Sequence, residues 1–170
     1  RPEHHTVTFG LGDGASTPDY RLVGDALVAA SGEAILGRSE LWRDLPHDVA
    51  NALAAAASAL AGGASLAGVR KALRSFSGLA HRVSFVTEHA GVRWYDDSKA
   101  TTPHAALAAV RGFESVVLLA GGRNKGLDLG ALRDAADRLR AVVAMGEAAE
   151  EVAAAFDGVV PVRLVTTGMD

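Results

Sequence analysis

The stretch "WYDDSKATTPHAALAAVRGFESVVLLAGGRNKG", residues 94–126, decides the class of fold that the sequence predicts. It begins with an apolar segment ending at Tyr95, passes through a dense polar cluster, and continues as a helical pattern from about Thr102 to Val110. The apolar strand "SVVLLAGG" follows and leads into the glycine-rich loop "GGRNKG", residues 121–126. Uniformly apolar strands that alternate with helices indicate a parallel sheet with helices on each side.

The alternation continues towards the end of the chain. We predict a helix over "LGALRDAADRLR" (129–140), a strand over "AVVAMG" (141–146), a helix over "EAAEEVAAAF" (147–156) and a strand over "VRLVTT" (162–167). Upstream, "HRVSFVTEHAGVRWYD" (81–96) predicts two strands that meet at a turn formed by His89, Ala90 and Gly91, with Val83, Phe85, Val92 and Trp94 at apolar positions.

The first half has a different pattern. Three strand-like pieces broken by glycines predict a β-meander: Tyr20–Val23, Leu27–Ala30 and Ala34–Leu36. A short strand, Thr6–Phe9, precedes them. Two helices are predicted next, over "PHDVANALAAAASALAGG" (46–63) and "SLAGVRKALRSF" (65–76), with Ser65 as the N-cap of the second. The segment "SGLAH", residues 77–81, then predicts a domain linker.

Composition excludes several classes of function. Seventeen basic and 20 acidic residues give a formal charge of −3, which favours neither nucleic acid nor an anionic membrane as a partner. The chain has no cysteine, so disulfides and thiolate metal sites are excluded, and its six histidines form no metal-binding pattern. No apolar run reaches the roughly 20 residues that a membrane helix needs. We therefore predict neither membrane insertion nor a metal ligand within the chain.

The polar cluster "DDSKATT", residues 96–102, is the strongest candidate for a site. Thr101 or Thr102 as the N-cap of the following helix explains one hydroxyl. It does not explain why Asp97, Ser98 and Lys99 lie together beside a helix N-terminus, at what we expect to be the carboxyl end of a parallel strand, a place suited to anions. From the residues alone, a small-anion or nucleotide site and an ordinary cap are equally good interpretations.

Other candidates are weaker. In "GGRNKG" the glycines allow a ligand to approach the backbone and Lys125 supplies a cation, but an ordinary strand-to-helix loop is the simpler interpretation. The loop "GLGDG", residues 10–14, is more typical of a turn than of a phosphate site. Arg82 at the linker fits either a salt bridge or an anion contact. His47 and Asn51 are spaced for one helix face, either as a polar pair at a helix start or as part of a site.

Taken together, the motifs resemble the UDP-N-acetylmuramoyl-L-alanine:D-glutamate ligases of the Mur ligase family. The resemblance is carried by "DSKAT" after an apolar strand, "GLAHR" before it and "LLAGGRNKG" after it, and in order by "HDVANALAA" and "TVTFGLG". It implies that residues 1–79 are the latter part of a central ATP-binding domain. Residues 80–170 would be most of a C-terminal Rossmann-like domain that binds D-glutamate. The expected fold class is thus α/β, a Rossmann-like parallel sheet preceded by an α+β part.

The resemblance also implies a reaction and site residues. ATP would phosphorylate the carboxylate of UDP-N-acetylmuramoyl-L-alanine, and the amine of D-glutamate would attack the acyl phosphate, with Mg²⁺ held by ligands outside this chain. Asn51, Arg82 and Asp97 would line the ATP site, and Lys99 would be the catalytic cation. Thr101 and Lys125 would bind D-glutamate. A cytoplasmic monomer acting in peptidoglycan synthesis is expected.

Three positions depart from the family pattern. Asp96 and Thr102 replace the two asparagines of Asn-Asp-Ser-Lys-Ala-Thr-Asn, and Asp48 stands where asparagine is common. The chain has no GxxxxGK[ST] phosphate loop. We therefore expect a piece of a longer enzyme that is inactive by itself. Two alternatives remain: another Mur-type or folylpolyglutamate-type amide ligase, and a non-catalytic Rossmann-like binding module.

Overall fold

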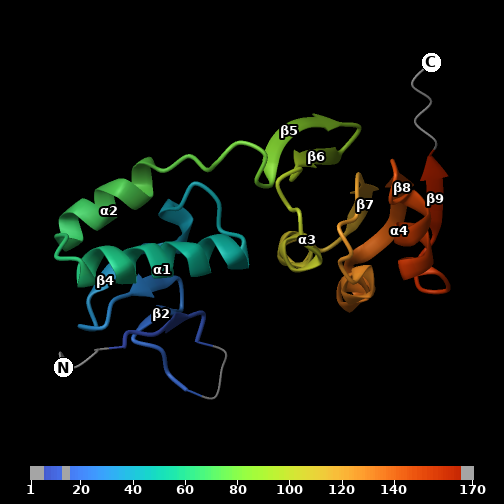
Figure 1. Cartoon of the computed structure of the whole chain (residues 1–170). Coiled ribbons are helices and arrows are strands. Elements are labelled where there is room, and N and C mark those ends of the chain that lie inside the picture. The colour runs from blue at the N-terminus through green and yellow to red at the C-terminus, as the bar shows by residue number, and fades with distance from the viewer. Residues whose placement is uncertain (1–5, 13–15, 166–170) are drawn as a thin grey trace. The chain divides into compact units, whose positions relative to one another are not determined.

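The computed structural model describes residues 6–12 and 16–165 and divides the chain into two compact units (Figure 1). The first unit is Arg1–Gly78 and the second is Leu79–Asp170. The sequence-based boundary lay one residue later, and residues 77–79 of the predicted linker have no regular secondary structure.

The sheet of the first unit has four strands in the order β1-β2-β3-β4. Their bounds are β1 Phe9–Gly10, β2 Tyr20–Val23, β3 Ala26–Val28 and β4 Ala34–Gly37. The last three pair antiparallel and confirm the predicted meander. Strand β1 pairs parallel with β2 and is shorter than the predicted strand, while Asp13 and Gly14 of the "GLGDG" loop lie outside the described residues.

Two helices cover this sheet, α1 (Pro46–Ala61) and α2 (Leu66–Ser75), after the 3₁₀ turn η1 (Arg38–Glu40). One face of α1 is buried at helical spacing through Val49, Ala52, Leu53, Ala56 and Ala57. These alanines leave room for close contact with the sheet residues Leu27 and Ile35 of the same core. Helix α2 begins as predicted, because the Ser65 hydroxyl accepts a hydrogen bond from the Gly68 amide at 3.1 Å.

The end of the first unit is fixed by a glycine. Gly78 has a φ of 87°, and a Cβ atom on it would lie 2.5 Å from the indole ring of Trp42. Phe76 packs edge-on against the same ring, with centroids 6.4 Å apart. The chain therefore leaves the first unit at a position that only glycine fills without strain.

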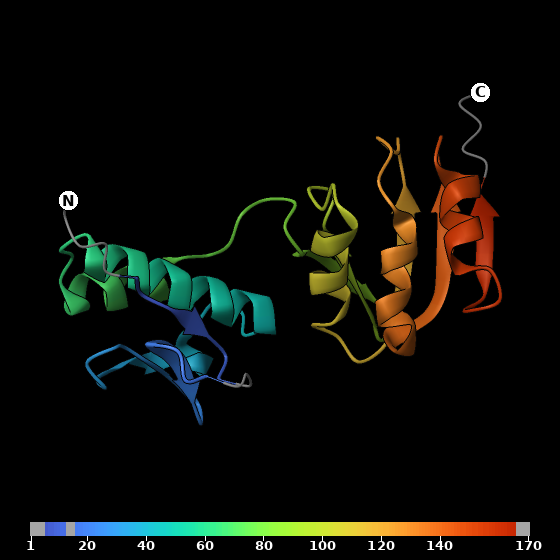
Figure 2. The ribbon, with the colours of Figure 1, turned by 60° about the horizontal axis from the view of Figure 1, so that its bottom comes forward.

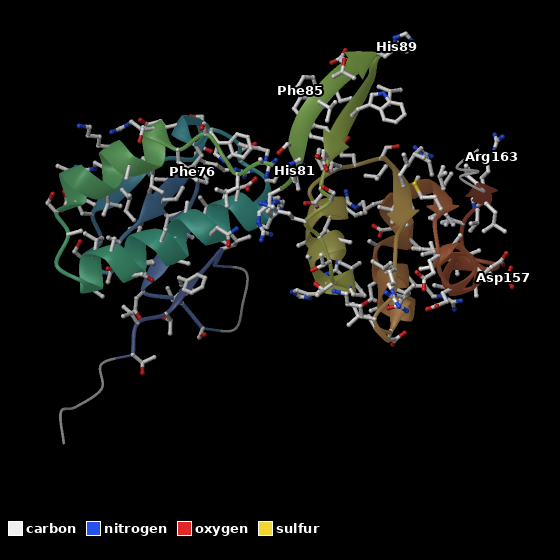
Figure 3. All side chains as sticks on the ribbon, turned by 45° about the horizontal axis from the view of Figure 1, so that its top comes forward. Phe76, His81, Phe85, His89, Asp157 and Arg163 are labelled. Carbon is white, nitrogen blue, oxygen red and sulfur yellow. The ribbon has the colours of Figure 1, made fainter. Side chains whose placement is uncertain are left out.

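The second unit begins with a β-hairpin of β5 (Ser84–His89) and β6 (Val92–Asp96), which pair antiparallel. Ala90 and Gly91 both have positive φ, as a two-residue type I′ turn requires, so the predicted turn is confirmed. Of the four apolar positions predicted here, Val83 is buried, but Val92 and Trp94 are exposed. Phe85 is exposed as well (Figure 3).

A three-stranded parallel sheet follows, in the order β7-β8-β9. Its strands are β7 (Val116–Gly121), β8 (Leu139–Met145) and β9 (Val162–Val165), and its helices are α3 (Pro103–Val110) and α4 (Ala149–Phe156). The core joins Leu107 of α3, Val142 of β8 and Phe156 of α4. The predicted α/β class is thus confirmed (Figure 2).

Two expectations about this sheet are wrong. Within residues 79–165, helices cover one face only, and Val117 and Leu119 on the other face of β7 are 52% and 49% exposed. The "DDSKATT" cluster was expected at the end of a parallel strand. It follows β6 instead, whose two-residue turn commits that strand to antiparallel pairing with β5.

The segment predicted as a helix over 129–140 also differs. It forms 3₁₀ turns, η2, over Leu129–Arg138, with non-helical angles at Ala135. Leu132 and Ala135 are buried at the three-residue spacing of a 3₁₀ helix, and β8 begins at Leu139, where the helix was expected to continue. Packing thus overrides the helix propensity of the segment.

The described residues include no helix with the length and apolar character required to cross a bilayer.

Candidate active site

Residues 96–102 lead from the end of β6 to α3 and carry half of the predicted site residues, Asp97, Lys99 and Thr101. The helix starts at Pro103, and the Thr102 hydroxyl accepts a hydrogen bond from the Ala105 amide at 3.3 Å. Of the two threonines proposed as the cap, Thr102 is therefore the one that caps α3. Thr101 is exposed, and its hydroxyl makes no hydrogen bond within the described part of the chain, so it is available to a ligand.

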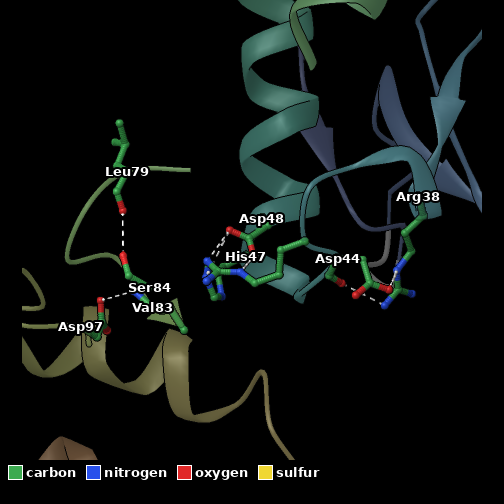
Figure 4. A network of polar contacts seen from close by, with 9 residues as sticks. Arg38, Asp44, His47, Asp48, Leu79, Val83, Ser84 and Asp97 are labelled. Atoms are coloured by element: carbon green, nitrogen blue, oxygen red, sulfur yellow. Dashed lines mark hydrogen bonds and ion pairs between the residues drawn. The ribbon is translucent and has the colours of Figure 1, made fainter. Parts of the chain in front are cut away.

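Two aspartates of this segment are tied to the chain just before β5. Oδ1 of Asp97 accepts a hydrogen bond from the Val83 amide at 3.1 Å (Figure 4). Oδ2 of Asp96 lies 2.6 Å from Nδ1 of His81, and its Oδ1 accepts from the Ser98 amide at 2.9 Å. The bond from His81, followed by those from the Ser98 amide and hydroxyl, lowers the pKa of Asp96 to about 2.

The partner segment, residues 81–83, is an unusual turn. His81 and Val83 both have positive φ, 63° and 49°, and the His81 carbonyl accepts a hydrogen bond from the Lys99 amide at 3.2 Å. Arg82 lies between these two residues. The structure thus brings together four of the predicted site residues in one junction: Arg82, Asp97, Lys99 and Thr101.

The cations of the predicted site are exposed, and among the described residues they have no ion-pair partner. Arg82, Lys99 and Lys125 each have exposed side chains, and none forms a salt bridge to any residue within 6–12 or 16–165. Other arginines of the chain, such as Arg43 and Arg74, are paired with carboxylates. Unpaired cations that are held by a well-defined backbone are suited to phosphate or carboxylate ligands.

Lys125 lies in the loop after β7, at the carboxyl end of the parallel sheet. Here β7 approaches β8 so closely that a Cβ atom on Gly121 would overlap the Met145 carbonyl oxygen, at 1.9 Å. Asn124 shapes the loop: its Oδ1 accepts from the Leu127 amide at 2.9 Å, and its Nδ2 donates to the Leu127 carbonyl at 3.1 Å and to Glu151. Sequence reasoning missed Asn124, although asparagine one residue before Lys125 is a turn signal.

The remaining predicted residue, Asn51, belongs to the first unit. It is exposed on α1, one turn after His47, whose Nε2 lies 3.5 Å from Oδ1 of Asp48. Asp48 in turn binds Arg43 through both oxygens, at 2.6 and 3.0 Å (Figure 4). Asn51 is therefore accessible on a helix whose start is held by an ion pair.

No group of three histidine, aspartate or glutamate side chains gathers into a metal site anywhere in residues 6–12 and 16–165.

Comparison with known proteins identifies the relatives of the chain. No protein-family model matches it. A UDP-N-acetylmuramoylalanine–D-glutamate ligase of Frankia casuarinae is 47% identical over 158 residues, 88% of this chain and 33% of that protein. Ligases of the same name from Pseudomonas putida and Methylococcus capsulatus are 41% and 42% identical, over 94% and 98% of this chain and 37% of each protein. The chain is a relative of the D-glutamate ligases of the Mur family.

Solved Mur ligases share the fold. The UDP-N-acetylmuramate–alanine ligase of Thermotoga maritima gives a TM-score of 0.67 at 21% identity, over 94% of this chain and 39% of that one. MurF of Acinetobacter baumannii gives 0.63 at 27% identity, over 94% and 37%. The chain spans about a third of the length of the D-glutamate ligases that it matches.

The three positions that depart from the expected D-glutamate ligase pattern all have structural partners here. Asp48 binds Arg43, Asp96 binds His81 and the Ser98 amide, and Thr102 caps α3. Each replacement side chain is therefore engaged in a contact that fixes its own segment.

Proposed function

We propose that this chain forms part of an ATP-dependent ligase that joins D-glutamate to UDP-N-acetylmuramoyl-L-alanine in peptidoglycan synthesis. The names of the relatives support this substrate pair. The observation that carries the proposal is the junction of residues 81–83 with 96–101, which presents Arg82 and Lys99 as exposed cations without ion pairs among the described residues. A ligase that handles phosphates and carboxylates needs such cations.

The proposed roles follow the chemistry of each side chain. Arg82 contacts the phosphates of ATP, with Asn51 and Asp97 elsewhere in the nucleotide site. Asp97 has one oxygen on the Val83 amide. Lys99 faces the reacting phosphate and carboxylate. Thr101 and Lys125, both exposed, hold the carboxylates of D-glutamate.

The reaction has two steps. A carboxylate oxygen of the muramoyl-alanine attacks the terminal phosphorus of ATP, which releases ADP and leaves an acyl phosphate. The amine of D-glutamate then attacks the carbonyl carbon, and phosphate leaves as the amine loses its proton. Negative charge collects on oxygen in both steps, so the fixed charge of Lys99 stabilises them most. Bound Mg²⁺ would neutralise phosphate charge, and we assign its ligands to residues outside this chain.

The experiment measures ADP formation by the full-length protein that contains this chain. We expect turnover that requires both UDP-N-acetylmuramoyl-L-alanine and D-glutamate. Lys99→Ala and Lys125→Ala should each lose about 2 to 3 kcal/mol of transition-state stabilisation, with the Lys125 variant raising KM for D-glutamate. The matched control is Lys71→Ala, because Lys71 is an exposed lysine on α2 to which the proposal assigns no role.

Each alternative predicts a different result. Stimulation by an amino acid other than D-glutamate would indicate another amide ligase of the same superfamily. Near-normal turnover in both lysine variants would indicate a non-catalytic binding module. The 170-residue chain alone should form no ADP, because its sequence contains no GxxxxGK[ST] loop. We expect the full-length enzyme to act as a monomer in the cytoplasm.

A further inference from the structure

The turn at residues 81–83 holds backbone strain on both sides of Arg82. His81 and Val83 have φ values of 63° and 49°. A left-handed conformation is unfavourable for an ordinary residue, and for a β-branched residue such as valine it is rare. Val83 is only 5% exposed. Strained positions of this kind persist only where neighbouring groups fix them.

Three hydrogen bonds from residues 96–99 fix this turn. The Asp96 carboxylate binds the His81 ring at 2.6 Å, the Lys99 amide donates to the His81 carbonyl at 3.2 Å, and Asp97 accepts from the Val83 amide at 3.1 Å. Asp96 also binds the Ser98 amide at 2.9 Å. The Asp96 carboxylate therefore connects His81, which precedes Arg82, to Ser98, which precedes Lys99.

We propose that Asp96 and His81 are positioning residues, whose hydrogen bond holds the backbones of Arg82 and Lys99 in the arrangement that presents both cations to an anionic ligand. The proposal rests on the proposed function, since it assumes that Arg82 and Lys99 act on phosphate and carboxylate groups. Neither Asp96 nor His81 needs to touch substrate. Their side chains are 33% and 55% exposed, and they act through the segments that they join.

The hydrogen bond between Asp96 and His81 determines which ring nitrogen of His81 carries a proton. An ionised carboxylate accepts hydrogen bonds at both oxygens, so Nδ1 of His81 must carry a proton in this chain. An asparagine, as in the family pattern, has one accepting end. If its oxygen keeps the Ser98 amide, its NH₂ group faces His81 and requires an unprotonated Nδ1. Asp96→Asn should therefore keep the contact but move the imidazole proton to Nε2.

The first test uses the 170-residue chain and ¹⁵N NMR of its imidazole rings. In the wild type, Nδ1 of His81 should be protonated; in Asp96→Asn, at a pH where an ordinary imidazole is neutral, the proton should be on Nε2. In Asp96→Ala, His81 should lose the fixed Nδ1 proton and give the averaged signals of an unrestrained imidazole, in which Nε2–H predominates, and the Ser98 amide should exchange faster with solvent. Asp157→Ala, which removes an exposed carboxylate after α4, is the control and should change none of these signals. An unchanged His81 ring in Asp96→Ala would overturn the pairing.

The second test measures kcat and KM of the full-length protein with ATP and D-glutamate. Asp96→Ala and His81→Ala should each lose about tenfold or more in kcat/KM, and the double variant should lose little beyond either one. Asp96→Asn should restore most of the loss. Additive losses, or none, would overturn positioning even in an active ligase. Absence of ligase activity in the wild type would instead refute the proposed function, while the NMR result would still decide the pairing. If Asp96→Ala does not fold, Asp96→Asn carries both tests.

Discussion

Asp96, which stands where the family pattern has asparagine, forms hydrogen bonds with the His81 ring and the Ser98 amide. The sequence marked it as a departure from the family pattern, and its role could not be predicted because its partner, His81, is 15 residues away. Only the antiparallel pairing of β5 with β6 brings the two ends of this segment together, with Ser84 opposite Asp96. A residue's partner across a hairpin depends on the strand register, which local sequence patterns specify weakly.

Asp96 should make the stability of the chain depend on pH in acid. Its pKa falls from 3.8 to about 2 on folding, mainly through the hydrogen bond from His81, so the unfolded chain binds more protons between these values. The stabilisation is therefore complete above about pH 5 and is lost as the pH falls through about 2. Urea unfolding across this range should show the wild type losing its advantage over Asp96→Asn.

Asp157→Asn is the comparison for this experiment, because Asp157 is exposed and its carboxylate forms no hydrogen bond or ion pair in the part of the chain that the structure describes. Its unfolding midpoint should follow that of the wild type at every pH. A constant difference between wild type and Asp96→Asn from pH 5 down to pH 2 would contradict the assignment.

At the start of helix α3, two neighbouring threonines have different roles: Thr102 stabilises the helix, and Thr101 is proposed to bind substrate. Thr102 caps the helix through its hydroxyl, whereas the Thr101 hydroxyl has no partner among the described residues. Thr102→Ala should therefore lower the free energy of unfolding by about 1 kcal/mol, and Thr101→Ala should change it little. Thermal or urea unfolding of the 170-residue chain measures both.

In the full-length enzyme the order of the two variants should reverse: the substitution with little effect on stability should be the one that changes KM. Thr101→Ala should raise KM for D-glutamate if its hydroxyl binds that substrate, while Thr102→Ala should leave KM close to normal at a temperature where both are folded. Equal destabilisation by the two substitutions would show that the cap is shared between them.

Element types were predictable where local signals agree. Ser65 as an N-cap, the Ala90–Gly91 turn and the meander of the first unit all follow from short-range chemistry and are confirmed. The 3₁₀ turns of η2 were not, because Arg133 binds the carbonyls of Ala154 and Ala155 on α4, some 20 residues away. Good helix formers yield to such contacts, which the segment's own sequence does not encode.

The cations of the candidate site could be predicted from the sequence, but the backbone that holds them could not. The "DDSKATT" and "GGRNKG" motifs identified the cations by residue type. The strained turn at His81 and Val83 could not be predicted from the sequence, since neither residue has an intrinsic preference for positive φ. The hairpin before "DDSKATT" was predicted, but its second strand was wrongly expected in the parallel sheet, because an apolar strand has the same sequence pattern in parallel and antiparallel sheets.

At the scale of the whole molecule, the chain consists of two units joined through residues without regular secondary structure. Leu79 is 57% exposed and Phe76 is 48% exposed, so both are accessible to a protease that cuts after large apolar residues. We expect brief chymotrypsin digestion to cut first at these positions and to release fragments that correspond to the two units, Arg1–Gly78 and Leu79–Asp170. Mass spectrometry identifies the cut sites.

Leu53 provides the internal comparison for this digestion. It is fully buried in α1, and cleavage after it requires the first unit to unfold. First cuts inside α1, rather than at Phe76 or Leu79, would contradict the division into two units.

Asn124, which shapes the Lys125 loop, is also a site at which the protein can deamidate during storage. The chain has two asparagines, Asn51 and Asn124, and no glutamine, and side-chain amides are the groups most prone to slow hydrolysis in warm solution. Hydrolysis of Asn124 would replace its NH₂ donor with a carboxylate oxygen that faces the Leu127 carbonyl and Glu151. Two bonds would become repulsions, and the loop would open. The junction around Asp96, where carboxylate and hydroxyl groups stand in place of amides, has no such weak point, so stored protein should lose its Lys125 loop first.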